Sequence, residues 1–375
     1  MDNINQFPIR AIEISTSFMT CDVMDMSYFD PLIKKASDHG INAVTIFIIP
    51  DSYYPETSSK KSWLYEEGLD WPSEKFPQYR NINCLNSNPE KEFIPDLISL
   101  CHSLNMKVYL RTINNKHRWL YPQHENWRAL RLSTEGKAVP THACCWDIST
   151  FMDYYYAVLR ELLERYATGI IKVDGLLLDQ QKLFGPYINE ESQIEFERRT
   201  GNKMDFTKIQ QLRDYWSSRN AERVKDTVEF AKKISPELEI GLTVEAVKED
   251  HFLNGESGLK HEFHNLQTTQ TDFMHHQIFD HSDDELFNMW EEFTLKGPLW
   301  IMLDPTASDA GWKENYWGWQ PQTPESIKAE IQKVKRIKAT LTKAQNLLGI
   351  SQFPINRLPL NHKNLTAALK ETGNA

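Results

Sequence analysis

Two acidic residues, Asp179 and Glu245, each end a short apolar segment, and they stand 66 positions apart. Paired carboxyl groups are the usual equipment for cleaving a glycosidic bond. One acts as acid or acid/base and the other as nucleophile or base, about 5 Å apart for retention of configuration and about 6.5–9.5 Å for inversion. The sequence therefore suggests sugar-bond hydrolysis and leaves both spacings open.

The two segments, 173–179 and 239–245, have the alternation of buried β-strands. Side chains alternate between faces along a strand, so Gly175, Leu177 and Asp179 share one face, while Leu176 and Leu178 share the other. The second segment repeats this arrangement, with an inner face formed by Gly241, Thr243 and Glu245. An apolar outer face and an inner face that ends in a carboxylate are typical of parallel barrel strands at the active-site end.

Strand-like and amphipathic helix-like segments alternate along all 375 residues. This pattern predicts an α/β fold, a (β/α)8 TIM-type barrel with long insertions in the loops that follow strands. We expect one catalytic domain over 1–375, with a core of about 8–345 and a C-terminal tail of about 346–375. The predicted strands are 9–15, 41–50, 106–112, 173–179, 239–245, 264–271, 298–304 and 347–353. The predicted helices are 28–39, 92–104, 150–166, 190–199, 207–234, 283–295 and 324–344.

Long aromatic loops, 51–90 and 114–149, interrupt this alternation. Loops of that length in a compact domain are commonly functional, and flat aromatic rings stack on the apolar faces of sugars. A segment rich in Trp and Gly, 308–322, follows the seventh predicted strand. By strand parity or by position in these loops or in this segment, the substrate-binding candidates are Arg111, Trp127, His142, Trp146, Trp317, Glu13 and Asp304. The last two, both inward-facing acids, are also reserves for the acid/base role.

Composition excludes several other classes of protein. A net charge of −10 without a long basic stripe argues against a nucleic-acid partner, and no apolar run could span a membrane. The N-terminus lacks a signal-peptide pattern and the five cysteines form no C-x-x-C pair, so we expect a cytoplasmic protein with reduced thiols and no cofactor. The histidines match no compact ligand motif, so no metal is expected; they are His117, His142, His275 and His276. The expected partner is a carbohydrate substrate, and whether the chain forms a homo-oligomer is left open.

Several segments resemble a known family. The run 166–179 resembles the fourth barrel strand of alpha-L-fucosidase-like glycoside hydrolases and of related hypothetical glycosyl hydrolases. The loop 125–137, the Cys145-Trp146 pair, the helix end 196–201 and the strand 296–305 are similar to other segments of that group. The resemblance spans roughly residues 90–320 and implies a retaining glycosidase in which Asp179 is the nucleophile. Glu245 is assigned as acid/base by its spacing.

Three other interpretations remain. Asp179 could cap a turn and Glu245 be solvated, and Arg111 could form a structural ion pair inside the barrel. The chain could be a carbohydrate-binding barrel without catalysis, which Gln180 after the predicted nucleophile would suit. It could also be a lyase or aldolase that uses a lysine Schiff base, with Lys172 or Lys182 nearest to the site.

Overall fold

The computed structural model describes residues 6–16, 25–49, 68–82, 84–113, 117–133, 135–179, 187–245, 269–277, 282–303, 305, 322–353, 355 and 358–375.

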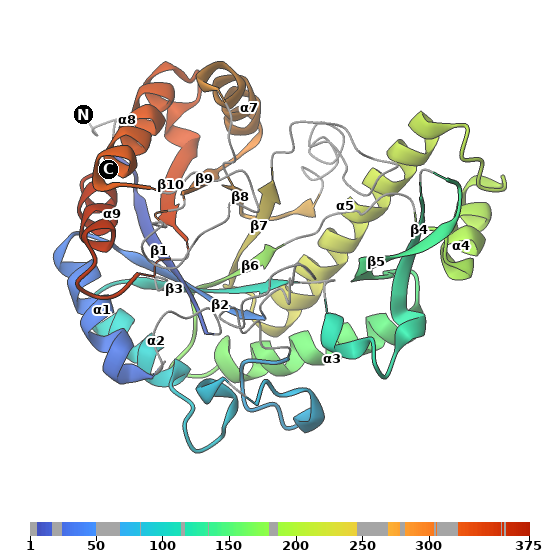
Figure 1. The fold of residues 1–375 in the computed structure, drawn as a ribbon, viewed down its shortest axis with the longest axis horizontal. Coiled ribbons are helices and arrows are strands. Elements are labelled where there is room, and N and C mark those ends of the chain that lie inside the picture. The colour runs from blue at the N-terminus through green and yellow to red at the C-terminus, as the bar shows by residue number, and fades with distance from the viewer. Residues whose placement is uncertain are drawn as a thin grey trace.

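Eight parallel strands close into a barrel, as the sequence predicted (Figure 1). Around the barrel each strand is hydrogen-bonded to two neighbours, in the order β1-β10-β9-β8-β7-β6-β3-β2. The strands are β1 (Ile9–Ser15), β2 (Ala43–Ile49), β3 (Lys107–Ile113), β6 (Gly175–Asp179), β7 (Glu239–Glu245), β8 (Phe273–Gln277), β9 (Leu299–Leu303) and β10 (Leu347–Gln352). Because all strands run the same way, their carboxyl ends meet at one mouth, where barrel enzymes place their active sites.

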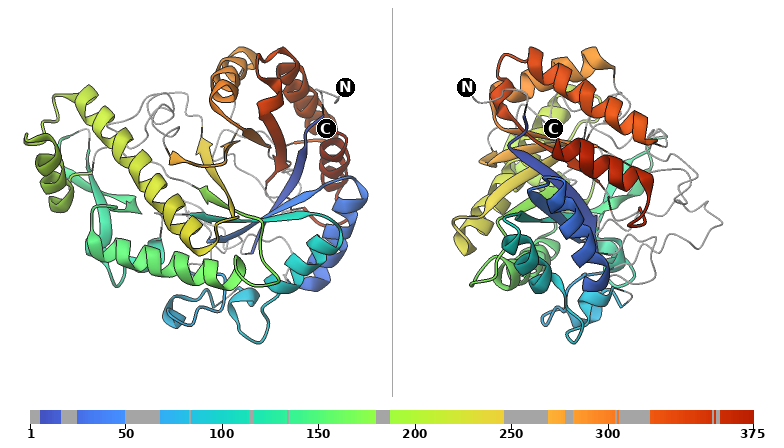
Figure 2. Two further views of the ribbon diagram at one scale, coloured as in Figure 1. Left: turned by 180° about the vertical axis from the view of Figure 1, so that it is seen from behind. Right: turned by 90° about the vertical axis from the view of Figure 1, so that its left-hand side faces the viewer.

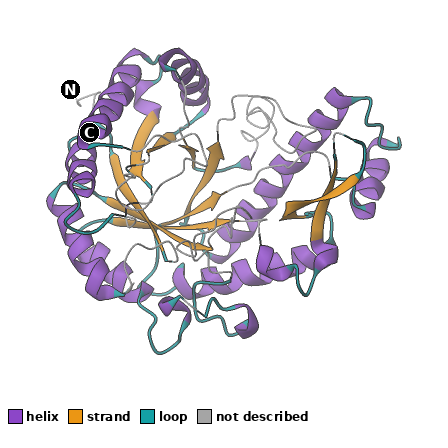
Figure 3. Ribbon diagram, in the orientation of Figure 1, coloured by secondary structure: helices purple, strands orange, loops and turns teal. Residues whose placement is uncertain are grey.

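Helices surround the barrel and cover its outer face (Figure 3). Outward-facing side chains such as Leu176, Leu178, Ile240 and Leu242 are completely buried in this layer. The helices are α1 (Met26–Asp38), α2 (Ile94–Ser103), α3 (Ser149–Tyr166), α4 (Glu190–Thr200), α5 (Ile209–Ile234), α7 (Asp283–Lys296), α8 (Pro324–Thr340) and α9 (Lys363–Gly373).

Local sequence signals fix several helix ends. The Asp25 side chain accepts a hydrogen bond from the Ser27 amide and so caps α1. Ser282 and Glu285 form a capping box at the start of α7. Gly201, with a φ of 70°, ends α4 in the left-handed conformation that glycine adopts without a steric cost.

An insertion follows β3 and extends away from the barrel (Figure 2). The antiparallel hairpin β4 (Arg128–Leu132) and β5 (Ala138–Cys144) lies beside α4, at the outer ends of α3 and α5. Residues 114–149, expected from sequence as a loop, thus contain a small sheet. Because this insertion and α4 follow barrel strands, the chain enters them from the mouth side of the barrel.

Two sequence predictions about the second half of the barrel need correction. The sixth barrel strand is β8, not 264–271; of that predicted segment only residues 269–271 are described, and they are not a strand. The predicted strand 347–353 is confirmed as β10, and so residues 346–375, expected as a C-terminal tail beyond the core, belong to the barrel. They supply β10, which closes the barrel against β1, and α9, which packs on α8.

The start of the described chain meets the C-terminus beside the closing strands. Phe7 donates a backbone hydrogen bond of 3.2 Å to the carbonyl of Ala375, and the C-terminus lies next to α8 in two views (Figure 2). Within the described part of the chain, no helix is long and apolar enough to cross a membrane.

Candidate functional site

The amino-terminal half of the barrel interior is filled by a plug of three aromatic side chains facing three glycines. The Phe273 and Trp300 rings stack with centroids 4.2 Å apart, and Tyr109 meets the Trp300 ring edge-on at 5.1 Å. A Cβ added at Gly175, Gly241 or Gly349 would lie within 2.5 Å of one of these rings. The plug closes the barrel below the mouth, so polar groups above it are reached only from the carboxyl ends of the strands.

Above the plug, Arg111 forms ion pairs with two carboxylates. Its Nη1 lies 2.5 Å from Glu13 Oε2, while its Nε and Nη2 lie 3.0 Å and 2.9 Å from Asp179 Oδ2. All three side chains are at most 1% exposed and come from β1, β3 and β6. The inward parity predicted for these residues from the alternation of their strands is confirmed.

The second oxygen of Glu13 faces β8 and β10. His275 Nε2 lies 2.9 Å from Glu13 Oε1, and the Ser351 hydroxyl donates a short hydrogen bond to the same oxygen. Burial alone would raise the pKa of Glu13, but the charges of His275 and Arg111, with the hydrogen bonds from His275 and Ser351, lower this pKa to about 2. Glu13 is therefore an ionised carboxylate at neutral pH, which argues against the acid/base role held in reserve for it.

The Arg111 guanidinium is further enclosed by apolar and sulfur groups. Its carbon lies 5.0 Å and 4.6 Å from the ring centroids of Phe47 and Phe353, and Nη1 lies 3.2 Å from the Met302 sulfur. Burial would lower the pKa of Arg111, but the charges of Asp179 and Glu13 raise it above its usual value. The arginine is thus a fixed positive charge held between two carboxylates.

His275, Glu13 and Ser351 do not form a nucleophilic triad. A serine nucleophile needs one histidine nitrogen, with the acid on the other. Here His275 Nε2 faces both Ser351 and Glu13, and its Nδ1 lies 3.3 Å from the Thr243 hydroxyl. The hydroxyl of Ser351 is directed at a carboxylate instead of being activated by the histidine.

Glu245 is the last residue of β7, and β7 pairs with β6, the strand that ends at Asp179. Leu178 pairs with Leu242, so the position level with Asp179 is Thr243, and Glu245 lies two residues further towards the mouth. That offset corresponds to roughly 8 Å between the two Cα atoms, from the strand spacing and the rise per residue. The side chain of Glu245 lies outside the described part of the structure, as does that of His142 on β5. Asp304 and Trp317 fall entirely outside the described residues.

The two tryptophans expected to contact a sugar are packed against protein. Trp127 is 8% exposed, stacks on His124 with centroids 3.8 Å apart and donates to the Thr150 hydroxyl. Trp146, 4% exposed, meets the Tyr155 ring edge-on at 5.1 Å. A sugar could stack on either ring only after neighbouring side chains moved.

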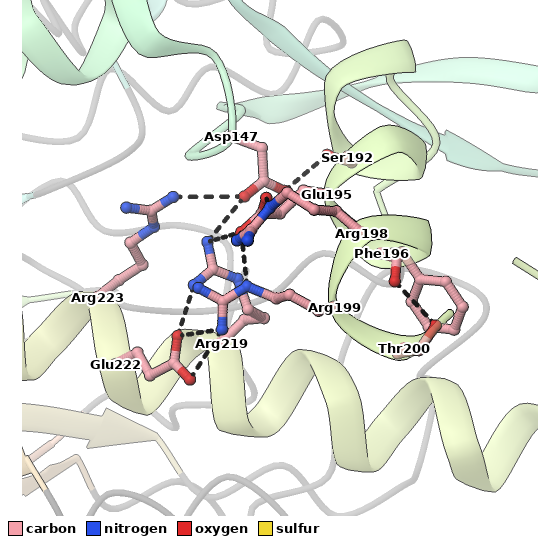
Figure 4. Close-up of polar contacts among 10 residues, drawn as sticks. All are labelled: Asp147, Ser192, Glu195, Phe196, Arg198, Arg199, Thr200, Arg219, Glu222 and Arg223. Atoms are coloured by element: carbon pink, nitrogen blue, oxygen red, sulfur yellow. Dashed lines mark hydrogen bonds and ion pairs between the residues drawn. The ribbon is translucent and has the colours of Figure 1, made fainter. Parts of the chain in front are cut away.

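A second polar cluster anchors the insertion (Figure 4). Arg219 of α5 bonds Asp147 at 3.1 Å and Glu222 at 2.5 Å, and Asp147 also accepts from Ser192 of α4. Its side chain is 6% exposed and that of Asp147 only 3%. The cluster borders a hollow of about 370 Å³ lined by four basic and four acidic residues, Glu195, Arg199, Arg219, Glu222, Arg223, Lys225, Asp226 and Glu229. Because the charges of these residues balance, we interpret the cluster as a structural ion-pair network that fixes α4 to α5.

Sequence reasoning missed His275 and Ser351 as members of the site. Ser351 lies on the last predicted strand, and an inward parity count on that strand would have found it. The sequence predicts the sixth strand at 264–271, which ends before His275, so strand parity assigns His275 to no face.

The comparisons with known proteins bear on the fold. No protein-family model and no curated protein matches the chain. Among solved structures, the PgaB (BpsB) glycoside hydrolase domain from Bordetella bronchiseptica is similar, with a TM-score of 0.60 at 10% identity, over 93% of this chain and 95% of that one. An alpha-L-fucosidase isoenzyme from Paenibacillus thiaminolyticus has a TM-score of 0.61 at 12% identity, over 98% of this chain. A beta-galactosidase from Bacillus circulans gives 0.61 at 12% identity, over 94% of this chain.

The chain spans about half of the last two proteins, 49% and 51% of their lengths. At these identities the similarity supports the (β/α)8 barrel fold alone.

Proposed function

We propose that the protein is a retaining glycoside hydrolase and that alpha-L-fucosides are its substrate class. The observation that carries the proposal is the carboxylate of Asp179, which ends the fourth barrel strand and is held by the Nε and Nη2 of Arg111. The two contacts from one guanidinium hold the carboxylate in a single orientation, which favours its attack as a nucleophile. The barrel form shared with glycoside hydrolases and the resemblance of the run 166–179 to fucosidases support the same conclusion.

In the proposed mechanism Asp179 attacks the anomeric carbon while Glu245 protonates the leaving oxygen. The covalent glycosyl-enzyme is then hydrolysed by a water that Glu245 deprotonates, which restores both groups and retains the configuration. The adjacency of β6 and β7 supports this division of roles, because both strands end at the same mouth. A fixed cation beside Asp179 also restrains the carboxylate in one orientation before attack.

The first test is hydrolysis of a panel of aryl glycosides that includes the aryl alpha-L-fucoside, with the configuration of the first product followed by NMR. We expect turnover with retention and a loss of at least about 1,000-fold in kcat for Asp179→Asn. A 2-fluoro glycosyl inactivator should label Asp179, as identified by peptide mass spectrometry.

Inversion of configuration would contradict the nucleophile assignment, as would full activity of Asp179→Asn. Thermal stabilisation by sugars without turnover of any member of the panel would replace the hydrolase with a carbohydrate-binding barrel.

A further inference from the structure

Four side chains form a continuous polar chain across the barrel, from His275 through Glu13 and Arg111 to Asp179. Each link is a direct contact: 2.9 Å from His275 to Glu13, 2.5 Å from Glu13 to Arg111, and 2.9 Å from Arg111 to Asp179. None of the four is more than 1% exposed. At that depth charges are weakly screened by salt and water, so a change at Glu13 is felt at Asp179.

The two oxygens of Glu13 have separate partners. Oε1 accepts from His275 and Ser351, and Oε2 faces Arg111 Nη1. With both oxygens engaged and no exposed surface, Glu13 has no place to receive a substrate proton. What it supplies to the site is a fixed negative charge on the side of Arg111 that faces away from Asp179.

We propose that Glu13 is a positioning residue that weakens the hold of Arg111 on Asp179 and so keeps the carboxylate reactive. This inference rests on the proposed function. A single guanidinium charge faces two carboxylates, and the attraction to Asp179 must be partly given up as that oxygen bonds to the anomeric carbon. Because Arg111 also interacts with Glu13, its attraction to Asp179 is weaker, and less of that attraction is lost when Asp179 attacks.

Within the described part of the barrel, few charged or titratable groups are seen to contact Arg111 and Asp179, directly or through Glu13. β1 contributes Glu13, β3 contributes Arg111, and β8 contributes His275. The inward side chains that pack against them from β7, β9 and β10 are neutral: Thr243, Met302 and Ser351. Removing the Glu13 charge takes away a carboxylate that shares Arg111 with Asp179.

The test is Glu13→Gln, which keeps the shape of the side chain and an oxygen to accept from Arg111. Without the second carboxylate, the full charge of Arg111 acts on Asp179, which becomes harder to protonate and less nucleophilic. We expect kcat to fall about 10- to 100-fold with KM nearly unchanged. The acid limb of the kcat/KM profile should move down by about one pH unit.

Glu239→Gln is the matched control, because Glu239 accepts from Tyr109 and Lys107 at the opposite end of the barrel. This variant should keep both kcat and the acid limb of the wild type. A Glu13 that merely supports the fold would leave the acid limb of Glu13→Gln in place, and loss of Arg111 from its position would move the limb up. Either result overturns the proposal.

Ser351→Ala covers the case in which Glu13→Gln does not fold. Removing the Ser351 donor concentrates the Glu13 charge on Arg111, so the acid limb should move up, opposite to the Glu13→Gln shift. An unchanged or lowered limb overturns the inference. If the wild type turns over no glycoside, the proposed function fails and the inference fails with it. If the wild type and Asp179→Asn behave as expected and the acid limbs do not, only the role of Glu13 is lost.

Discussion

Replacing Glu13 by glutamine should remove a pH-dependent part of the free energy of unfolding. The pKa of Glu13 is lowered from 4.5 to about 2 in the folded protein, by the charges of His275 and Arg111 acting against burial. A depressed pKa stabilises the fold at any pH above the unfolded-state value, and this stabilisation is lost as the pH falls towards the folded-state value. At about 1.4 kcal/mol per pKa unit, the full contribution is about 3 kcal/mol.

Linkage fixes how this contribution declines with pH. Between about pH 6 and pH 3, about 2 kcal/mol of the 3 should disappear from the wild type and nothing comparable from Glu13→Gln. The assay is urea unfolding of both proteins at several pH values in this interval, with the difference in unfolding free energy plotted against pH. The difference should be largest near neutrality and shrink as the pH falls.

A difference that stays constant from pH 6 to pH 3 would refute the reasoning, because it would mean that Glu13 has the same proton affinity in the folded and unfolded chains. The ion pair with Arg111 would then contribute only through packing and hydrogen bonds. If the slope of the unfolding free energy against urea concentration differs between the two proteins, their denatured states differ. Their free energies would then be compared with one common slope.

Two stability predictions concern other parts of the molecule. Gly175→Ala would bring a Cβ within 2.3 Å of the Tyr109 ring and should lower the unfolding free energy, measured by thermal melts, by about 1–3 kcal/mol. The control is Gly297→Ala, where a Cβ would have no atom within 4 Å, and it should change the unfolding free energy by less than about 0.5 kcal/mol. Equal effects of the two changes would contradict the close packing of the Tyr109 ring against Gly175. Arg219→Met leaves the buried Asp147 short of a cation and should cost about 3 kcal/mol in chemical denaturation; a loss below about 1 kcal/mol would show that the cluster is not stabilising.

Strand parity carried most of what could be predicted about the site. Alternation along three strands placed Glu13, Arg111 and Asp179 on the inner face, and the structure joins all three by ion pairs. This worked because both faces of these strands are buried along most of their length, so their side chains form two sets, one for the interior and one for the helices.

The sixth strand was misplaced because it does not read as apolar. Phe273–Gln277 contains two adjacent histidines, one for each face of the strand. His275 is satisfied inside by Glu13 and Ser351, and His276 accepts from Trp290 on the helical side. Glu13 and Ser351 come from distant parts of the chain and Trp290 comes from the following helix, so nothing in the segment itself reveals that the histidines are buried.

The tryptophans show a different limit. Position in a loop after a strand suggested ligand contact for Trp127 and Trp146, but whether an indole faces solvent or protein depends on the elements that fold over it. Here α3 supplies partners for both, through Thr150 and Tyr155. The sequence prediction also misses the hairpin that begins directly after Trp127, because its short strands resemble an irregular loop in sequence.

The pairing of each large ring with a bare backbone position couples residues that are far apart in the chain. Gly349 leaves the space that the Trp300 indole fills, since a Cβ there would lie 2.5 Å from the indole. Reducing the indole to a leucine would leave a void, and a methyl group at 349 would then fill space instead of clashing. We therefore expect these two positions to tolerate substitution together and to resist it singly. In a redesigned or diverging barrel of this kind, each aromatic residue of the plug should change together with the glycine that it faces.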